Sequence, residues 1–292
     1  MQGVILQGIG GFYYAMDEAG EVHQVRAQRK IRRERLKPKV GDRVEISPGE
    51  GEEDGWIHQI LPRRNELVRP PVANIDVVVI VAAAAAPLPD LMMVDRLMLN
   101  ARRANIDVQL VISKCDLDEG LADDILRQYR GAECDPMKVS SATGEGIDAL
   151  RQRLAGRVHA LAGQSGAGKS TLINALYGLD LETGDLSRRI DRGKNTTRSC
   201  ELIPVQGGGM VLDTPGFSLL ETDVFDPVEI KDSYPEFIPC EGKCYFQPCY
   251  HASEPRCAVR DAVAAGTIDA DRHERYRAVL EDMRQRWRDR YD

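Results

Sequence analysis

One glycine-rich stretch, Gly163-Gln-Ser-Gly-Ala-Gly-Lys-Ser170, constrains this chain more than any other segment. It matches the pattern of a phosphate-binding loop at every fixed position. The apolar residues Val158 to Ala162 before it predict a strand, and Thr171 to Leu176 after it predict the start of a helix. A strand–loop–helix unit of this kind presents backbone N–H groups and a helix N-terminus to phosphate groups. The segment therefore predicts an α/β fold with a nucleotide site.

The residues of this loop have separate expected roles. Lys169 would neutralise the β and γ phosphates, and the Ser170 hydroxyl would hold Mg²⁺. Asp213 follows the apolar strand residues 210–212, where such enzymes place a second carboxylate linked to Mg²⁺. We expect the nucleotide to be bound by Gly163, Gln164, Ser165, Gly166, Ala167, Gly168, Lys169, Ser170 and Thr171.

A second motif, Ser113-Lys114-Cys115-Asp116, ends the predicted strand 108–112. The guanine-recognition motif of GTPases is Asn-Lys-X-Asp, whose aspartate accepts hydrogen bonds from the N1 and N2 groups of guanine. Adenine lacks that pair of donors, and an unpaired buried carboxylate is costly. Ser113 replaces the asparagine, so the match is partial, and an ATP-using enzyme stays an alternative. The small residues Ser141 and Ala142 follow residues 137–139 and resemble the loop that lies behind a guanine ring.

The order of these motifs is unusual. In an ordinary GTPase the phosphate loop comes first and the base-recognition motifs come last. Here the base-recognition residues precede the phosphate loop. Residues 148–157 would be the segment that connects what are the two chain ends in an ordinary GTPase domain. The same parallel sheet can form from this permuted order. The segment after Asp213, which senses the γ phosphate in GTPases, would then lead directly into the C-terminal region.

Residues 66–225 alternate strand and helix patterns. The run 75–83, apolar except for Asp76, is typical of a buried parallel strand. Helical spacing over 90–104 and a further strand over 107–112 follow it. Repeated βα units of this kind predict a parallel sheet covered by helices on both faces.

Residues 1–65 have a different pattern. Short alternating stretches separated by turn residues predict a small β-barrel, with an OB-like barrel as the first candidate. The strands are expected at 12–16, 22–25, 43–46 and 56–60. Between them, residues 26–39 hold eight basic residues and one acid, in a chain whose net charge is −7. This local charge favours contact with an RNA backbone, although a solvated loop is the alternative.

Residues 226–292 begin with a cysteine-rich segment and continue with helical patterns over 257–265 and 271–291. Three thiols and one imidazole match the four ligands of a closed, structural zinc site. A reduced cluster without metal is the alternative. Cys240 is left over and is expected to be a free thiol, with substitution for one of the four ligands as the alternative. The candidate zinc ligands are Cys244, Cys249, His251 and Cys257.

Taken together, these motifs resemble the circularly permuted GTPases, specifically the ribosome small subunit-dependent GTPase A family, over nearly the whole chain. The resemblance implies an OB-like barrel (1–65), a permuted GTPase domain (66–225) and a helical zinc-binding domain (226–292). It implies Mg²⁺-dependent GTP hydrolysis to GDP, stimulated by the small ribosomal subunit, and a role late in the maturation of that subunit. The expected partners are the subunit and its rRNA, and the expected cofactors are GTP or GDP, Mg²⁺ and one structural Zn²⁺.

The resemblance also extends to Arg192-Gly-Lys-Asn-Thr-Thr-Arg198 and Asp213-Thr-Pro-Gly-Phe217. The first segment resembles a switch in which Thr196 or Thr197 would complete the Mg²⁺ shell, and Gly216 would approach the γ phosphate. Phe217 stands where many GTPases have a glutamine that orients water. A phenyl ring cannot do this, so we expect slow hydrolysis by the protein alone.

The length of the apolar runs and the number of cysteines indicate in which cellular compartment the protein acts. The longest apolar run, 77–86, is too short to span a bilayer. Seven cysteines, an odd number, argue against a secreted disulfide scaffold. We therefore expect a cytoplasmic protein without membrane association, and nothing in the sequence requires more than a monomer. A further alternative is an RNA-binding scaffold with a degenerate nucleotide site, against which the intact Lys169, Ser170 and Asp213 argue.

Overall fold

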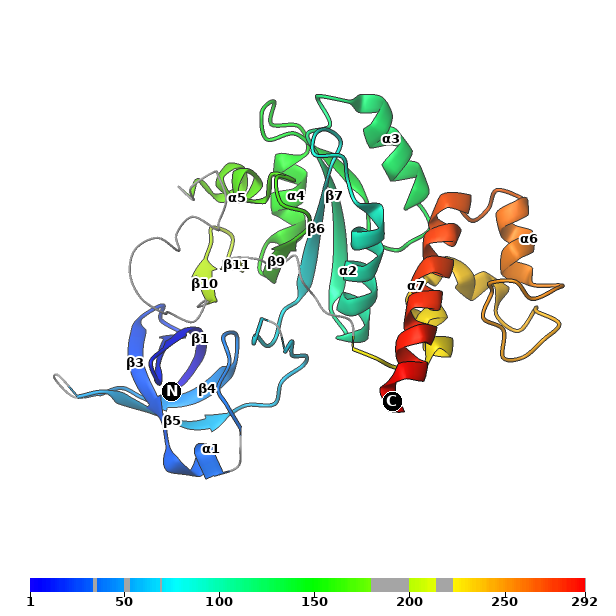
Figure 1. Ribbon diagram of the computed structural model, residues 1–292. Helices are drawn as coiled ribbons and strands as arrows, with labels where there is room; N and C mark the ends of the chain where they lie inside the picture. Colours follow the sequence, from blue (N-terminus) through cyan, green and yellow to red (C-terminus); the bar gives the residue numbers. More distant parts are fainter. Residues whose placement is uncertain (34–35, 50–52, 69, 180–199, 214–222, 292) are drawn as a thin grey trace.

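The computed structural model describes residues 1–33, 36–49, 53–68, 70–179, 200–213 and 223–291. Its parts follow one another across the molecule: a barrel, a central sheet with helices on both faces, and a C-terminal group of helices that packs beside α2 (Figure 1). The N-terminus lies in the barrel, and the C-terminus lies at the end of α7. Among the described residues, no helix is both long and apolar enough to cross a membrane.

Five strands close the N-terminal barrel in the order β1-β2-β3-β5-β4-β1, which is the arrangement of an OB-type Greek-key barrel. Alternate residues such as Val25, Val44 and Ile57 point inward and are fully or almost fully buried. The first strand was not among the expected ones, and a short helix lies inside the segment expected as a basic loop. The elements are β1 (Gln2–Ile9), β2 (Phe12–Asp17), β3 (Val22–Ala27), α1 (Arg29–Arg33), β4 (Arg43–Ser47) and β5 (Gly55–Ile60).

The central sheet has the strand order β10-β11-β9-β6-β7-β8. All of its neighbouring strands are parallel except β10, which runs antiparallel to β11. Later strands in the chain thus lie on one side of the sheet and earlier strands on the other, as the permuted motif order predicts. The strands are β6 (Val77–Ala83), β7 (Asp107–Ser113), β8 (Met137–Val139), β9 (Val158–Ala162), β10 (Glu201–Pro204) and β11 (Met210–Asp213).

Helices cover both faces of this sheet. Its central strand, β6, is therefore buried on both sides. Val78 and Ile80 belong to the apolar cluster under α2 and α3, whereas Val79 and Val81 belong to the cluster under α4 and α5. The expected three-layer arrangement is confirmed by this division. The helices are α2 (Leu91–Arg103), α3 (Glu119–Gln128), α4 (Ile147–Leu154) and α5 (Lys169–Tyr177).

The C-terminal region contains two α-helices at the expected places and three 3-10 helices. Tyr234, Phe237 and Tyr276 form its aromatic centre, with ring centroids 4.8 to 5.3 Å apart. Leu99 of α2 joins the same apolar cluster and so connects the region to the central sheet. The elements are η2 (Pro227–Ser233), η3 (Pro235–Cys240), α6 (Ala258–Ala264), α7 (Ala270–Arg288) and η4 (Asp289–Tyr291).

Candidate nucleotide site and metal centre

The predicted phosphate loop connects β9 to α5, as its flanking residues indicate. Gly163 has a φ of 137°, and a Cβ there would collide with the Val81 carbonyl oxygen on the neighbouring strand. Gly168 is the N-cap of α5 with a φ of 89°, a conformation that favours glycine. The glycines thus let the loop turn tightly over the end of the sheet, where the first N–H groups of α5 have no intrahelical partner.

Lys169 folds back over this loop. Its Nζ donates to the carbonyl oxygens of Gly163 and Gln164, both at 2.8 Å. Burial lowers the pKa of this lysine, since a partly desolvated ammonium without an anion is disfavoured. A phosphate between the loop N–H groups and Nζ would supply that anion.

The base-recognition motif and the phosphate loop are in direct contact. The Ser113 hydroxyl donates to the Ala167 carbonyl oxygen at 2.7 Å, and the Lys114 Nζ donates to the Gly166 carbonyl oxygen at 2.9 Å. Ser113 therefore makes a bond across the two loops even though it replaces the expected asparagine. This bridge was not predicted, because nothing in the sequence tells which backbone group a serine will reach.

The other predicted base-recognition residues occupy the same end of the sheet, because the carboxyl ends of parallel strands meet at one edge. Asp116 is exposed beyond β7, while the Cys115 thiol is buried and its pKa is raised by burial. Ser141 and Ala142 follow β8, where the Ser140 hydroxyl oxygen accepts a hydrogen bond from the Ala142 N–H at 3.2 Å. The structure thus brings both predicted motifs to one edge.

Asp213 ends β11 and is half-buried, beside the strand that precedes the phosphate loop. Ser170 and Thr171 lie in the first turn of α5, half-buried and exposed respectively. A hydroxyl and a carboxylate are oxygen ligands of the kind that Mg²⁺ prefers, so the donor set fits that ion. The predicted switch residues Thr196 and Thr197, and also Gly216 and Phe217, lie outside the described residues.

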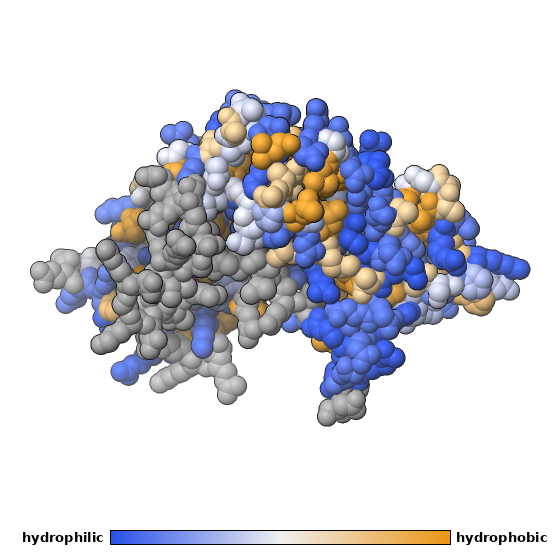
Figure 2. All heavy atoms as spheres, turned by 45° about the horizontal axis from the view of Figure 1, so that its top comes forward, coloured by the Kyte–Doolittle hydropathy of each residue, from blue (hydrophilic) through white to orange (hydrophobic). Residues whose placement is uncertain are grey.

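Apolar side chains are exposed at the same edge. Leu88 and Leu117 follow β6 and β7 and are 73% and 67% exposed. Figure 2 turns this end of the molecule toward the viewer, and hydrophobic residues gather there among polar ones. An apolar surface beside the phosphate loop suits the flat rings of a nucleotide base.

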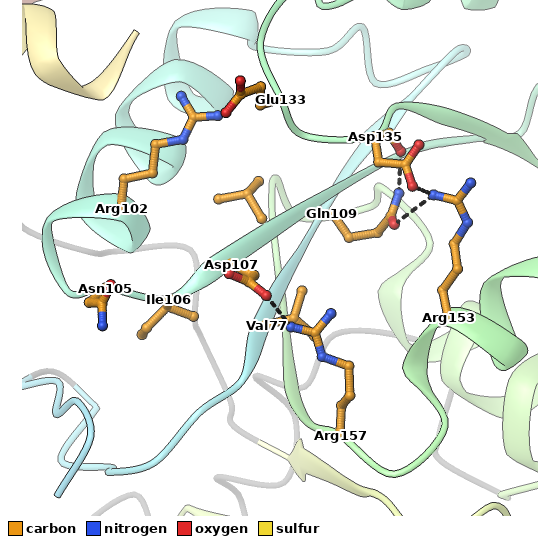
Figure 3. A pocket seen from close by; sticks show the side chains of 11 residues that line it. Val77, Arg102, Asn105, Ile106, Asp107, Gln109, Glu133, Asp135, Arg153 and Arg157 are labelled. Atoms are coloured by element: carbon orange, nitrogen blue, oxygen red, sulfur yellow. Dashed lines mark hydrogen bonds and ion pairs between the residues drawn. The ribbon is translucent and has the colours of Figure 1, made fainter. Parts of the chain in front are cut away.

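A separate depression of about 510 Å³ lies at the opposite end of the sheet. Asp107 and Gln109 at the start of β7 line it, and Figure 3 shows the arginines of α4 and its following turn pointing into it. Arg157 pairs with Asp107, and Arg153 pairs with Asp135, so these charges are neutralised within the wall. None of the predicted site residues lines this depression.

The four predicted zinc ligands form one buried cluster in the C-terminal region. Cys257 Sγ lies 3.9 Å from Cys244 Sγ and 3.8 Å from Cys249 Sγ, and His251 Nδ1 lies 3.6 Å from Cys244 Sγ. Tetrahedral coordination with Zn–S bonds of about 2.3 Å requires S···S separations of about 3.8 Å. The spacing therefore fits a zinc ion at the centre of the cluster.

The surroundings of the cluster also suit a cation. Burial raises the pKa of Cys249 to about 12 and also raises that of Cys257, so the thiolates need a nearby positive charge. The His273 Nε2–H donates to the His251 carbonyl oxygen at 2.8 Å and supports the ligand loop. No pattern in the sequence predicts this supporting role of His273. Cys240 is a buried free thiol outside the four-residue set.

Comparisons with known proteins agree with this geometry. A family model described as RsgA GTPase matches residues 60–223, and one described as RsgA N-terminal domain matches residues 2–57. The protein named small ribosomal subunit biogenesis GTPase RsgA from Geobacillus thermodenitrificans is 42% identical over 290 residues, covering 98% of each chain. The protein of the same name from Caldanaerobacter subterraneus is 39% identical over 293 residues, covering 100% of this chain and 98% of its own.

Two solved structures are similar over almost their full length. YjeQ from Thermotoga maritima superposes with a TM-score of 0.83 at 32% identity, covering 97% of this chain and 98% of that one. YloQ, described as a circularly permuted GTPase, superposes with a TM-score of 0.80 at 31% identity, covering 98% and 95%. With the barrel and the Cys3His cluster, these likenesses confirm the predicted fold class.

Proposed function

Because this chain belongs to the RsgA GTPase family and is a GTPase, we propose that it acts in the maturation of the small ribosomal subunit, with Mg²⁺-dependent hydrolysis that the subunit stimulates. The names of the relatives carry the ribosomal part of the proposal, and the contact between the two predicted nucleotide motifs carries the hydrolytic part. The hydrogen bonds of Ser113 and Lys114 to the phosphate loop support one continuous site for base recognition and phosphate binding.

The proposed roles follow the chemistry of each side chain. Lys169 would exchange its two carbonyl partners for the β and γ phosphates. Ser170 and Asp213 would hold Mg²⁺, which when bound neutralises charge developing on the phosphates. Asp116 would accept the N1 and N2 hydrogens of guanine. Thr196 or Thr197 would complete the Mg²⁺ shell, and Gly216 would approach the γ phosphate.

The barrel offers a surface suited to rRNA. Arg26 of β3 lies between Phe12 of β2 and Trp56 of β5 in the strand register. Its guanidinium carbon is 4.2 Å from the Phe12 ring centroid, and Trp56 is 46% exposed. Aromatic and arginine side chains on an OB barrel form stacking platforms for bases, and nearby basic residues attract the backbone. The basic α1 directly follows β3.

We propose that residues 1–65 and 226–292 contact rRNA. Residues 66–225 would bind and hydrolyse GTP. The protein would work in the cytoplasm as a monomer, and it would carry one zinc ion on its Cys3His cluster. A single peak near the chain mass of 32.5 kDa in light scattering would support the monomer.

The central test measures GTP and ATP hydrolysis by one preparation, with and without small ribosomal subunits and with and without Mg²⁺. We expect GTP-selective, Mg²⁺-dependent turnover that rises many-fold with subunits. Without them we expect turnover well below about 1 s⁻¹. Lys169→Ala should abolish turnover, whereas Lys231→Ala, a lysine outside the nucleotide site, should leave the turnover measured without subunits unchanged. A GTP turnover rate that does not rise when subunits are added would contradict the proposal.

The base assignment has its own test. Asp116→Asn replaces two acceptors by one acceptor and one donor, which matches xanthine rather than guanine. We expect this variant to lose GTP affinity by about a hundredfold or more and to bind xanthosine triphosphate instead. Unchanged preference for GTP would remove Asp116 from base recognition.

Metal content tests the zinc assignment. The purified protein should contain one zinc per chain by elemental analysis. Cys249→Ser should lower that content, whereas Cys240→Ser, a nearby buried cysteine outside the cluster, should keep it. Loss of zinc from the Cys240 variant alone would mean that the ligand set is wrong.

A further inference from the structure

Two consecutive aromatic residues are exposed on the loop between the first two candidate zinc ligands. Tyr245 is 65% exposed and Phe246 is 46% exposed, although large aromatic side chains are usually buried. Their rings meet edge to face with centroids 4.9 Å apart. Figure 1 places this loop at the outer edge of the molecule, beside α6 and far from the barrel. The pair is therefore accessible and is not needed to fill a core.

The loop is held in place at several points. Cys244 and Cys249 anchor its two ends in the buried cluster. The Tyr245 N–H donates to the Arg256 carbonyl oxygen at 3.1 Å, and the Arg256 guanidinium carbon lies 4.8 Å from the Tyr245 ring centroid. Because the backbone is already fixed, a partner that stacks here loses little affinity to ordering of the loop.

The surrounding charges and shape favour one kind of partner. Lys243 and Arg256 are exposed beside the rings, and the Glu254 carboxylate is engaged by the N–H groups of three backbone residues. Glu241 and Asp261 are exposed acids of the same region. Projecting rings suit a flat partner with a negative backbone better than an apolar side chain, which would need a groove. An unpaired nucleotide has both properties, since its base can stack and its phosphate can meet a cation.

We propose that Tyr245 and Phe246 form a base-stacking contact for unpaired nucleotides of RNA, oriented by the zinc cluster and assisted by Arg256. This inference rests on the proposed function, because the RNA would belong to the small ribosomal subunit. It assigns the C-terminal region a role in reading exposed bases rather than the backbone of a duplex.

The first test measures affinity for small ribosomal subunits in the full-length protein. Tyr245→Ala and Phe246→Ala should each weaken binding by about five- to 150-fold, the range for loss of one stacked base. Tyr245→Phe keeps the ring and should bind within about twofold of the unsubstituted protein. Zinc content must stay at one ion per chain in every variant, so that lost binding is not lost folding.

The second test identifies the partner. A photoreactive benzoylphenylalanine at position 245 should crosslink to rRNA at an unpaired nucleotide when irradiated in complex with subunits. Crosslinking only to a ribosomal protein, or to a base-paired rRNA segment, would overturn the inference. If the unsubstituted protein binds subunits and the alanine variants bind equally well, the stacking inference is wrong but the proposed function still stands. If the unsubstituted protein does not bind subunits at all, the proposed function fails with it.

Discussion

The barrel joins the central sheet mainly through apolar side chains and backbone pairing, with the partly exposed ion pair Lys39–Glu66 beside them. The C-terminal helices join it through a fully buried group of charges as well. At the barrel, Leu6 and Val40 belong to the same apolar cluster as Leu202 and Leu212 of the sheet. The edge contact is the pairing of Gln7 in β1 with Glu201 in β10. The apolar contacts of the cluster have little directional preference.

On the other side, Asp95 of α2 is fully enclosed and accepts from Arg272 at 2.5 Å and Arg275 at 2.6 Å, both on α7. Arg272 also pairs with Glu236 of η3. Burial lowers the pKa of Arg272, but attraction by Asp95 and Glu236 outweighs it and raises the pKa above its ordinary value. The cluster therefore sets the orientation of α7 on α2, and removal of one partner leaves a buried charge uncompensated.

The two tryptophans of the chain allow each junction to be followed separately. Trp56 lies on β5 of the barrel, and Trp287 lies on α7. A Trp287→Phe background reports on the barrel, and a Trp56→Phe background reports on the C-terminal helices.

The largest effect is expected at the charged junction. Asp95→Ala should lower the free energy of unfolding by about 3–5 kcal/mol, because it strands Arg272 and Arg275 in the interior. Urea unfolding followed by Trp287 fluorescence measures the change, and Trp56 should report a smaller one. Equal changes at both tryptophans would mean that the junctions are not separate.

The sheet between the junctions should be sensitive to acid. The His159 Nδ1–H donates to the Arg157 carbonyl oxygen, and Nε2 accepts from the Tyr177 hydroxyl at 2.9 Å. Burial lowers the pKa of His159 from 6.5 to about 4. The unfolded chain therefore binds the proton more tightly, so the stabilisation is present above pH 6.5 and is lost as the pH falls toward 4.

This loss should be about 3 kcal/mol between pH 7 and pH 4. His159→Gln removes the titration and should flatten the pH dependence of urea unfolding by that amount. Both tryptophans should report it, since the sheet supports both junctions. An unchanged slope in the glutamine variant would show that His159 does not titrate in this range.

A somewhat smaller effect is expected at the apolar junction. Leu6→Ala should cost about 2–3 kcal/mol, at the lower end for buried leucines because Leu6 lies near the surface. Trp56 should report it, and 1 M NaCl should not change it. Leu88→Ala, at an exposed leucine, serves as the matched control and should change stability by less than about 0.5 kcal/mol.

The smallest effect is expected at the strand edge. Gln7 Nε2 donates to Glu201 Oε2 at 3.3 Å in an exposed position. Gln7→Ala should change the stability reported by either tryptophan by less than about 0.5 kcal/mol. A loss above about 2 kcal/mol would mean that this edge, rather than the apolar cluster, holds the barrel.

Much of the fold could be predicted from local patterns. The apolar run of β6, the helical spacing of α2 and the phosphate loop between β9 and α5 all lie where the sequence indicates. β1 was missed because its two glycines, Gly3 and Gly8, weaken the strand pattern. The helix α1 was missed because a cluster of charges is equally typical of a loop.

The sequence by itself determined the features that depend on neighbouring residues: the turn of the phosphate loop, the four-ligand spacing and the permuted motif order. Only the tertiary structure decided which distant groups meet. It brought Ser113 to Ala167, 54 residues along the chain, and Arg272 to Asp95, 177 residues away. The physical reason is that periodicity and turn chemistry act over a few residues, whereas hydrogen bonds and buried ion pairs require partners that only packing selects.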